Sequence, residues 1–197
     1  MIPFRLLCKR LLLAIAVVLA GPLILASWLE ALFFGLQVEW IYNSCKELLA
    51  IIPTTIGQYL RLGFYWAVCT RVSPDVAMLL GSMIAHRGTT IGRGSCLGAY
   101  SIVGHADLGE NVLLGARVSI LSGKYQHGSP KERANGEATT NKYTRTTIGD
   151  NCWIGEGAII MANVGANCTV SAGAVVMRDV ADKTTVMGNP ARKVSLN

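Results

Sequence analysis

Hydrophobic residues follow two different patterns along this chain of 197 residues. In the first part they come in long uncharged runs, such as the one from Leu11 to Leu29. From Ile91 onward they recur singly at about every sixth position, often with glycine directly after them. Long runs are typical of helices that face lipid or fill a core, whereas a short fixed period indicates a repeated structural unit. The chain therefore divides into an apolar N-terminal segment and a repeat domain.

The repeat predicts one short strand in every six residues. Its aliphatic positions are Ile91, Leu97, Val103, Leu108, Leu114, Ile120, Ile148, Ile154, Val164, Val170 and Val176. These side chains can point inward and stack on their equivalents, while glycine relieves the corners between strands. Three units close one triangular coil, so residues from about Ile84 to Asn197 are predicted to form a mainly β, parallel β-helix. Cys152 and Cys168 take small inward positions, where packing is the expected role.

The uncharged run from Leu11 to Leu29 approaches the length that crosses a hydrocarbon core of about 30 Å. A basic cluster within residues 5–10 precedes it, as on the cytoplasmic side of a membrane segment. A cleavable signal peptide is the alternative, but the apolar character continues past any cleavage point. Gly21-Pro22 breaks the run, and the stretch that ends at Tyr42 is too short for two spans. We expect a re-entrant or monotopic helical hairpin that enters and leaves on the cytoplasmic face.

A second apolar stretch, residues 46–71, contains one charge that a membrane core would disfavour, that of Arg61. We expect it to pack against other helices or to lie on the membrane surface, with Arg61 and Trp66 available for the interface. The expected domains are a membrane-associated helical segment, 1–75, and a β-helix domain, 76–197.

Composition narrows the choice of function. The net charge is +6, but the basic residues are scattered without interleaved aromatics, so a nucleic-acid partner is not expected. The six cysteines show no CxxC pair and no metal-ligand spacing, so we expect reduced thiols and neither a disulfide framework nor a metal.

The repeat is interrupted between residues 121 and 147. This stretch is polar and charged, and it contains His127, one of three histidines in the chain. A long loop that leaves a rigid solenoid is usually functional, although a solvated histidine is the ordinary alternative. A neutral imidazole can accept a proton from a hydroxyl near neutral pH.

The loop sequence VSILSGKYQHGSPKERANGEATT resembles the extruded loop of the galactoside and maltose O-acetyltransferases. Further similar segments are the Trp-Ile-Gly of residues 153–155, SAGAVVMRDV of residues 171–180 and GNPARKV of residues 188–194. The resemblance covers roughly the last hundred residues. The sequence of residues 122–128 and the apolar N-terminal segment are more similar to a membrane-associated, polysaccharide-modifying branch of this family. The family resemblance implies a left-handed β-helix that assembles into homotrimers, with sites in the clefts between subunits.

The resemblance also implies a mechanism in which His127 is the general base that activates a hydroxyl for attack on acetyl-CoA. Glu137 could orient His127, although a plain surface carboxylate is an equal alternative. The residues implied for acetyl-CoA binding are Trp153, Glu156, Ala172, Met177, Arg178 and Arg192. Arg178 and Arg192 would meet phosphates, with solvated charge as the alternative.

The acceptor is less well defined by these motifs. The Asn and Asp that hold the sugar in the galactoside enzymes have no recognisable counterpart, and Tyr100 and His105 lie in roughly that region. His105 could line the acceptor cleft or serve structure, and His86 is expected to serve structure. The predicted activity is acetyl transfer to a sugar hydroxyl in surface polysaccharide or lipid-linked glycan biosynthesis, at the cytoplasmic face of the inner membrane.

Three alternatives remain beside this prediction. The γ-type carbonic anhydrases share the β-helix, but their zinc needs two histidines close together in one loop, and this chain has no such pair. A non-catalytic trimeric membrane scaffold would not need His127 or Trp153. Transfer of another acyl group, or transfer to the amine of an amino sugar, would use the same residues.

Overall fold

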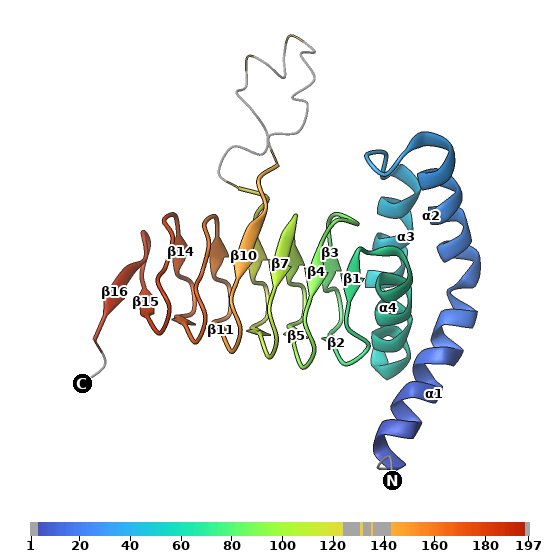
Figure 1. The fold of residues 1–197 in the computed structure, drawn as a ribbon, viewed down its shortest axis with the longest axis horizontal. Coiled ribbons are helices and arrows are strands. Elements are labelled where there is room, and N and C mark those ends of the chain that lie inside the picture. The colour runs from blue at the N-terminus through green and yellow to red at the C-terminus, as the bar shows by residue number, and fades with distance from the viewer. Residues whose placement is uncertain (1–3, 124–130, 132–134, 136–142, 196–197) are drawn as a thin grey trace.

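The computed structural model describes residues 4–123, 131, 135 and 143–195. Helices at one end of the molecule adjoin a row of triangular coils (Figure 1). The helices are α1 (Phe4–Leu19), α2 (Gly21–Phe34), α3 (Trp40–Ala50) and α4 (Thr54–Val68). The predicted parallel β-helix with N-terminal helices is confirmed.

The coils stack three parallel sheets along the long axis of the molecule. Sheet A joins β1 (Arg71–Val72), β4 (Thr90–Ile91), β7 (Ala106–Leu108) and β10 (Thr146–Ile148). Sheet B joins β2 (Ala77–Met78), β5 (Cys96–Leu97), β8 (Leu113–Leu114), β11 (Trp153–Ile154), β13 (Thr169–Val170), β15 (Thr185–Met187) and the antiparallel β16 (Arg192–Val194). Sheet C joins β3 (Met83–Ile84), β6 (Ile102–Val103), β9 (Ser119–Ile120), β12 (Ile159–Ile160) and β14 (Val175–Val176).

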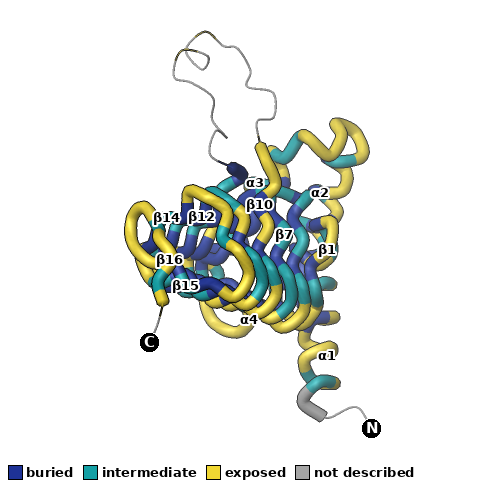
Figure 2. The backbone as a smooth tube through the Cα atoms, turned by 60° about the vertical axis from the view of Figure 1, so that its left-hand side comes forward, coloured by how far each residue is buried: buried dark blue, intermediate teal, exposed yellow. Residues whose placement is uncertain are grey.

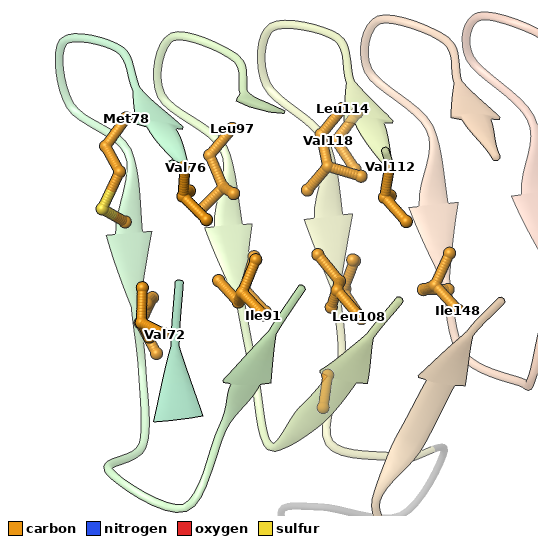
Figure 3. Packing of buried hydrophobic residues seen from close by; sticks show 14 of the residues in the cluster. Val72, Val76, Met78, Ile91, Leu97, Leu108, Val112, Leu114, Val118 and Ile148 are labelled. Atoms are coloured by element: carbon orange, nitrogen blue, oxygen red, sulfur yellow. The ribbon is translucent and has the colours of Figure 1, made fainter. Parts of the chain in front are cut away.

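Every aliphatic position of the predicted repeat is buried, and the side chains stack from coil to coil (Figure 3). In sheet A, for example, Val72 pairs with Ile91, Ile91 with Leu108, and Leu108 with Ile148. Cys152 and Cys168 are buried in the same core, so their predicted packing role is confirmed. The coils begin at β1, upstream of the expected boundary at residue 76, and β10 already includes the last two residues of the expected loop.

The helices close the N-terminal end of this core. Helix α4 packs on β1 and β2, and α1 packs on α4. Of the two placements expected for residues 46–71, packing against other helices is the one observed. Arg61 is not available for a membrane interface, because it is fully buried. Its guanidinium donates to the carbonyls of Leu49, Ile52 and Met78, at 3.0, 2.9 and 3.2 Å. Arg61 therefore joins α3 and α4 to the first coil, whereas Trp66 is about half exposed.

Helices α1 and α2 leave many large apolar side chains exposed. Figure 2 colours stretches of both helices as exposed. We call these residues the apolar helix surface: Leu7, Leu11, Leu12, Ile15, Val18, Leu19, Leu25, Leu29, Leu32, Phe33 and Phe34. Within the described residues, no single helix is long and apolar enough to cross a membrane. Together, α1 and α2 reach that length and composition as a pair bent by 63°.

Candidate active site at the loop edge

The chain passes from sheet C to sheet A along one edge of the prism, which we call the loop edge. Its turns lie at residues 85–89, 104–105, 161–163 and 177–179, and residues 121–145 stand in place of a short turn between β9 and β10. The expected catalytic residues His127 and Glu137 lie outside the described residues. The structure describes the loop up to Gly123 and again from Tyr143.

The two ends of the loop are bonded to each other and to His105. Thr144 N–H donates to the carbonyl of Ser122 at 3.1 Å, and the Thr146 hydroxyl donates to that of Leu121 at 2.8 Å. The His105 N–H donates to the Ser122 hydroxyl at 2.8 Å. Gly123 has a positive φ of 86°, and a Cβ there would lie 1.9 Å from the Thr144 hydroxyl. Glycine is therefore needed where the loop leaves the prism.

His105 is held in a defined protonation state beside the loop. Arg145 Nη2 lies 2.7 Å from His105 Nε2, and arginine can only donate, so Nε2 is the unprotonated nitrogen. Burial, the Arg145 charge and His86 together lower the pKa of His105, which favours the neutral ring. Arg145 is fixed in turn by an ion pair with Asp107 and a 3.0 Å bond to the Gly88 carbonyl.

His86, which was expected to serve structure only, lies next to His105, with 6.1 Å between the ring centroids. Its Nδ1 is 2.8 Å from a carboxylate oxygen of Glu39, which belongs to the turn before α3. The two histidines are 19 residues apart, the offset at which β3 pairs with β6. The length of one coil could therefore have predicted this neighbourhood from the sequence. The contribution of Glu39 could not be predicted, because it depends on how the helices dock.

The residues implied for acetyl-CoA binding lie on different sides of the prism. Met177 and Arg178 follow β14 at the loop edge, and Arg178 lines a cavity of about 440 Å³ together with Arg145 and Asp179. Trp153, 56% exposed, points outward from sheet B, the face opposite the loop edge. Arg192 lies in β16, at the end of sheet B.

Three further candidates lie at the edge where sheet B passes to sheet C. Glu156 and Ala172 occupy successive turns there, and Glu156 forms an ion pair with Arg117 of the preceding coil. Tyr100 occupies the same edge with a positive φ of 57°. Tyr100 and His105 thus lie at opposite ends of β6, and one chain does not bring these two expected acceptor residues together.

Comparisons with known proteins agree with the fold. Residues 145–178 match the model of the family described as bacterial transferase hexapeptide (six repeats), so the predicted repeat is confirmed. A comparison with curated proteins finds no match.

Three solved structures are similar to this chain. A maltose O-acetyltransferase from Clostridium difficile 630 is 24% identical, with a TM-score of 0.64 over 78% of this chain and 84% of that one. An N-acyltransferase from Bacillus cereus, bound to dTDP-4-amino-4,6-dideoxyglucose and coenzyme A, is 16% identical, with a TM-score of 0.50 over 66% and 85%. A perosamine N-acetyltransferase from Caulobacter crescentus is 23% identical, with a TM-score of 0.45 over 64% of this chain. The match covers 53% of that chain, so this protein spans about half its length.

Proposed function

We propose that this protein is an acetyl-CoA-dependent O-acetyltransferase that acts on a sugar hydroxyl in surface polysaccharide or lipid-linked glycan biosynthesis. The observation that carries the proposal is the long insertion between β9 and β10. It leaves the register of the coils intact and emerges beside His105, Arg145 and Arg178. A regular frame interrupted by one long polar segment suits a reaction that depends on positioning two substrates. The hexapeptide transferase match over the adjoining coils supports the same reaction class.

In the proposed reaction, His127 accepts the proton of the acceptor hydroxyl as its oxygen attacks the thioester carbonyl carbon. The carbon–sulfur bond then breaks, and the departing thiolate of coenzyme A takes the proton from the imidazolium. Glu137 orients His127. Arg178 and Arg192 bind phosphates of the donor, Trp153 lies against its pantetheine arm, and Glu156, Ala172 and Met177 complete the donor site.

The proposed site draws on more than one subunit. Trp153 lies on sheet B, whereas the described ends of the loop lie at the opposite edge of the prism, which supports a site shared between neighbouring copies. A neighbouring copy of the chain can place its sheet B face, with Trp153, next to the loop of the first. We therefore propose a homotrimer with the donor bound in the clefts between subunits, as hexapeptide-repeat enzymes usually assemble.

We further propose that the protein works at the cytoplasmic face of the inner membrane. Its apolar helix surface groups eleven exposed large apolar side chains on two neighbouring helices, and exposed apolar patches mark membrane or protein interaction sites. Lys9 and Arg10, both exposed on α1, are suited to anionic lipid head groups. Ile24, Ser27 and Glu30 of α2 are buried against the protein, which supports a helix pair that lies in the interface rather than one that crosses the bilayer. A cytoplasmic position would give the site access to acetyl-CoA.

Acetyl transfer to the amine of an amino sugar is the second candidate, favoured by the similarity to an N-acyltransferase that binds an amino sugar nucleotide. An amine would attack the same thioester. The two products differ chemically, because alkaline hydroxylamine removes an ester-linked acetyl group and leaves an amide intact.

The test combines glycan analysis with a variant. Mass spectrometry of surface glycans from cells with and without the protein should reveal an acetyl difference that hydroxylamine removes. His127→Asn should lower the release of coenzyme A by roughly 100-fold, the usual contribution of a general base. Lys131→Gln in the same loop is the matched control and should retain activity. Full activity of the His127 variant would contradict the mechanism, and glycans without any acetyl difference would favour a non-catalytic scaffold.

A further inference from the structure

A cavity of about 820 Å³ lies where the turn between α2 and α3 meets the loop edge of the first two coils. Its walls come from residues 36–43 of the helical segment, from the turns that carry His86 and His105, and from Tyr143 at the end of the loop. The volume is in the range of small-molecule sites. Among the described residues, none of those expected to bind the donor lines the cavity, whereas His105, expected near the acceptor, does.

The floor of the cavity holds an oriented carboxylate–imidazole pair. One Glu39 oxygen accepts from the Arg87 N–H at 2.8 Å, and the other accepts from His86 Nδ1 at 2.8 Å. A carboxylate can only accept, so Nδ1 carries the proton. The other ring nitrogen, Nε2, has no hydrogen-bond partner among the described residues. In the neutral ring, Nε2 is therefore an acceptor available to a hydroxyl group.

A second polar group on the wall is suited to donate. Lys46 Nζ lies 2.6 Å from Asn43 Oδ1, and because lysine can only donate, the amide oxygen faces Lys46. The Asn43 amide nitrogen has no partner within the described part of the chain. Gly88, also in the wall, allows a close approach to His105, since a Cβ at residue 88 would lie 2.7 Å from His105 Nε2. Acceptors and donors at fixed positions are what hydroxyl-rich ligands require.

The rim of the cavity is aromatic and apolar. Trp40 is 76% exposed, Tyr143 is exposed, and the Tyr143 ring lies 4.7 Å from that of His86. Flat aromatic rings with a polar tip suit ligands that have both apolar and polar faces. On the helical side the rim includes Leu36. No charged residue separates Leu36 in the sequence from the exposed Leu32, Phe33 and Phe34 of the apolar helix surface.

We propose that this cavity binds the sugar head group of a lipid-linked acceptor, while the lipid chain lies on the apolar helix surface. His86 accepts from one sugar hydroxyl, Asn43 donates to another, and Trp40 covers the ring. The inference rests on the proposed function and names the acceptor as an amphiphile rather than a free sugar. The cavity includes Tyr143, at the described end of the sequence segment that carries the proposed general base.

The test compares two pools of acceptor. Purified full-length protein is incubated with radiolabelled acetyl-CoA and either an organic-solvent extract of membranes from cells lacking the protein or the water-soluble glycans of the same cells. We expect transfer chiefly to the organic extract. Trp40→Ala and His86→Gln should each lower kcat/KM for that extract by at least about tenfold, the scale of one lost contact. Trp66→Ala, which changes a half-exposed tryptophan outside the cavity, is the matched control and should not lower it.

Coenzyme A affinity, measured by calorimetry, identifies variants that have lost their fold, and should be unchanged in all three. If His86→Gln loses its affinity for coenzyme A, Trp40→Ala alone tests the inference, because an exposed side chain can be removed without disturbing the core. Wild-type rates in Trp40→Ala, or equal transfer to water-soluble glycans, would overturn the inference and leave the proposed function intact. No transfer by the unchanged protein to either pool would instead overturn the proposed function.

Discussion

Arg87 is the residue that ties the helical segment to the first coil. Its guanidinium donates to the Ser27 carbonyl at 2.9 Å, pairs with the Glu30 carboxylate and lies 5.0 Å from the centre of the Tyr42 ring. Glu30 also accepts from the N–H groups of Ile41 and Tyr42 at the start of α3. Burial alone would raise the pKa of Glu30, but these bonds and Arg87 hold it below its usual value. The pair therefore fixes the turn that carries Glu39.

Replacing Glu30 by glutamine should lower the free energy of unfolding by about 3 kcal/mol, because the buried Arg87 charge loses its partner. Glu47→Gln on exposed α3 surface is the matched control and should change it by less than about 0.5 kcal/mol. Chemical denaturation at pH 7 measures both values.

The pH dependence of the same pair has a definite sign. The pKa of Glu30 is lower in the folded than in the unfolded protein. The carboxylate therefore contributes fully to the free energy of unfolding when the pH is well above its usual pKa of 4.5. This contribution is lost as the pH falls from there through the folded pKa. Unfolding experiments between pH 7 and pH 3 should show this loss in the wild-type protein and a smaller one in Glu30→Gln. Parallel curves for the two proteins would contradict the assignment.

The sequence predicts the inward residues of the coils well and the charged pairs poorly, for a physical reason. Inward positions of a narrow prism accept only side chains that pack in its core. An aliphatic residue in fixed register, such as Ile154, can therefore be identified from spacing alone. Arg87 and Glu30 are 57 residues apart and meet only because α2 docks against the coils. The burial of Arg61 escapes the sequence for the same reason, since its three carbonyl partners lie in α3, in the connection between α3 and α4, and in β2.

At the scale of elements, the repeat visible in the sequence begins only at Ile91, one coil after the structural start, because the aliphatic residues of the first coil lack the usual glycine. Val72, Met78 and Ile84 are followed by serine, leucine and alanine, yet they pair in register with the next coil. Helices α3 and α4 cover the end of this coil, and side chains such as Tyr42 and Tyr65 bond to its backbone at Ile84. Contacts with the helices therefore stabilise a coil that the repeat alone does not specify.

The apolar helix surface predicts membrane binding that a single charge can weaken. Leu32→Glu at a residue 76% exposed should reduce binding to vesicles of phosphatidylglycerol and phosphatidylethanolamine by about tenfold, because a carboxylate must enter the lipid interface. Flotation on a density gradient measures the bound fraction. The melting temperature should stay within a few degrees, since an exposed side chain contributes little to folding.

The matched control is Leu113→Glu on β8, where a leucine 46% exposed lies on the coils instead of the helices. It makes the same chemical change and should leave vesicle binding intact. Equal loss in both variants would indicate a general effect of charge, and unchanged binding by Leu32→Glu would contradict a membrane role for this surface.

For the whole molecule, the decisive question is whether one active site draws on two chains. His127→Asn removes the proposed base, and Trp153→Ala weakens the proposed donor site on the opposite face of the prism. If each site takes its loop from one subunit and its tryptophan from the next, random trimers of the two variants in equal amounts contain intact sites. Those sites amount to about one quarter of the total, from two independent chances of one half. Coenzyme A release at low acetyl-CoA should then recover to roughly that fraction of the wild-type rate.

A second mixture separates this arrangement from a site within one chain. When the double variant is co-expressed with wild-type chains in equal amounts, shared sites again leave about one quarter of the activity. Sites confined to one chain would leave about one half in this mixture, and no recovery in the first. Because both mixtures contain the same two substitutions, a difference between them can only come from how the subunits share the site. Because Trp153 and the ends of the loop lie on opposite sides of the prism, we expect the two mixtures to have equal activities.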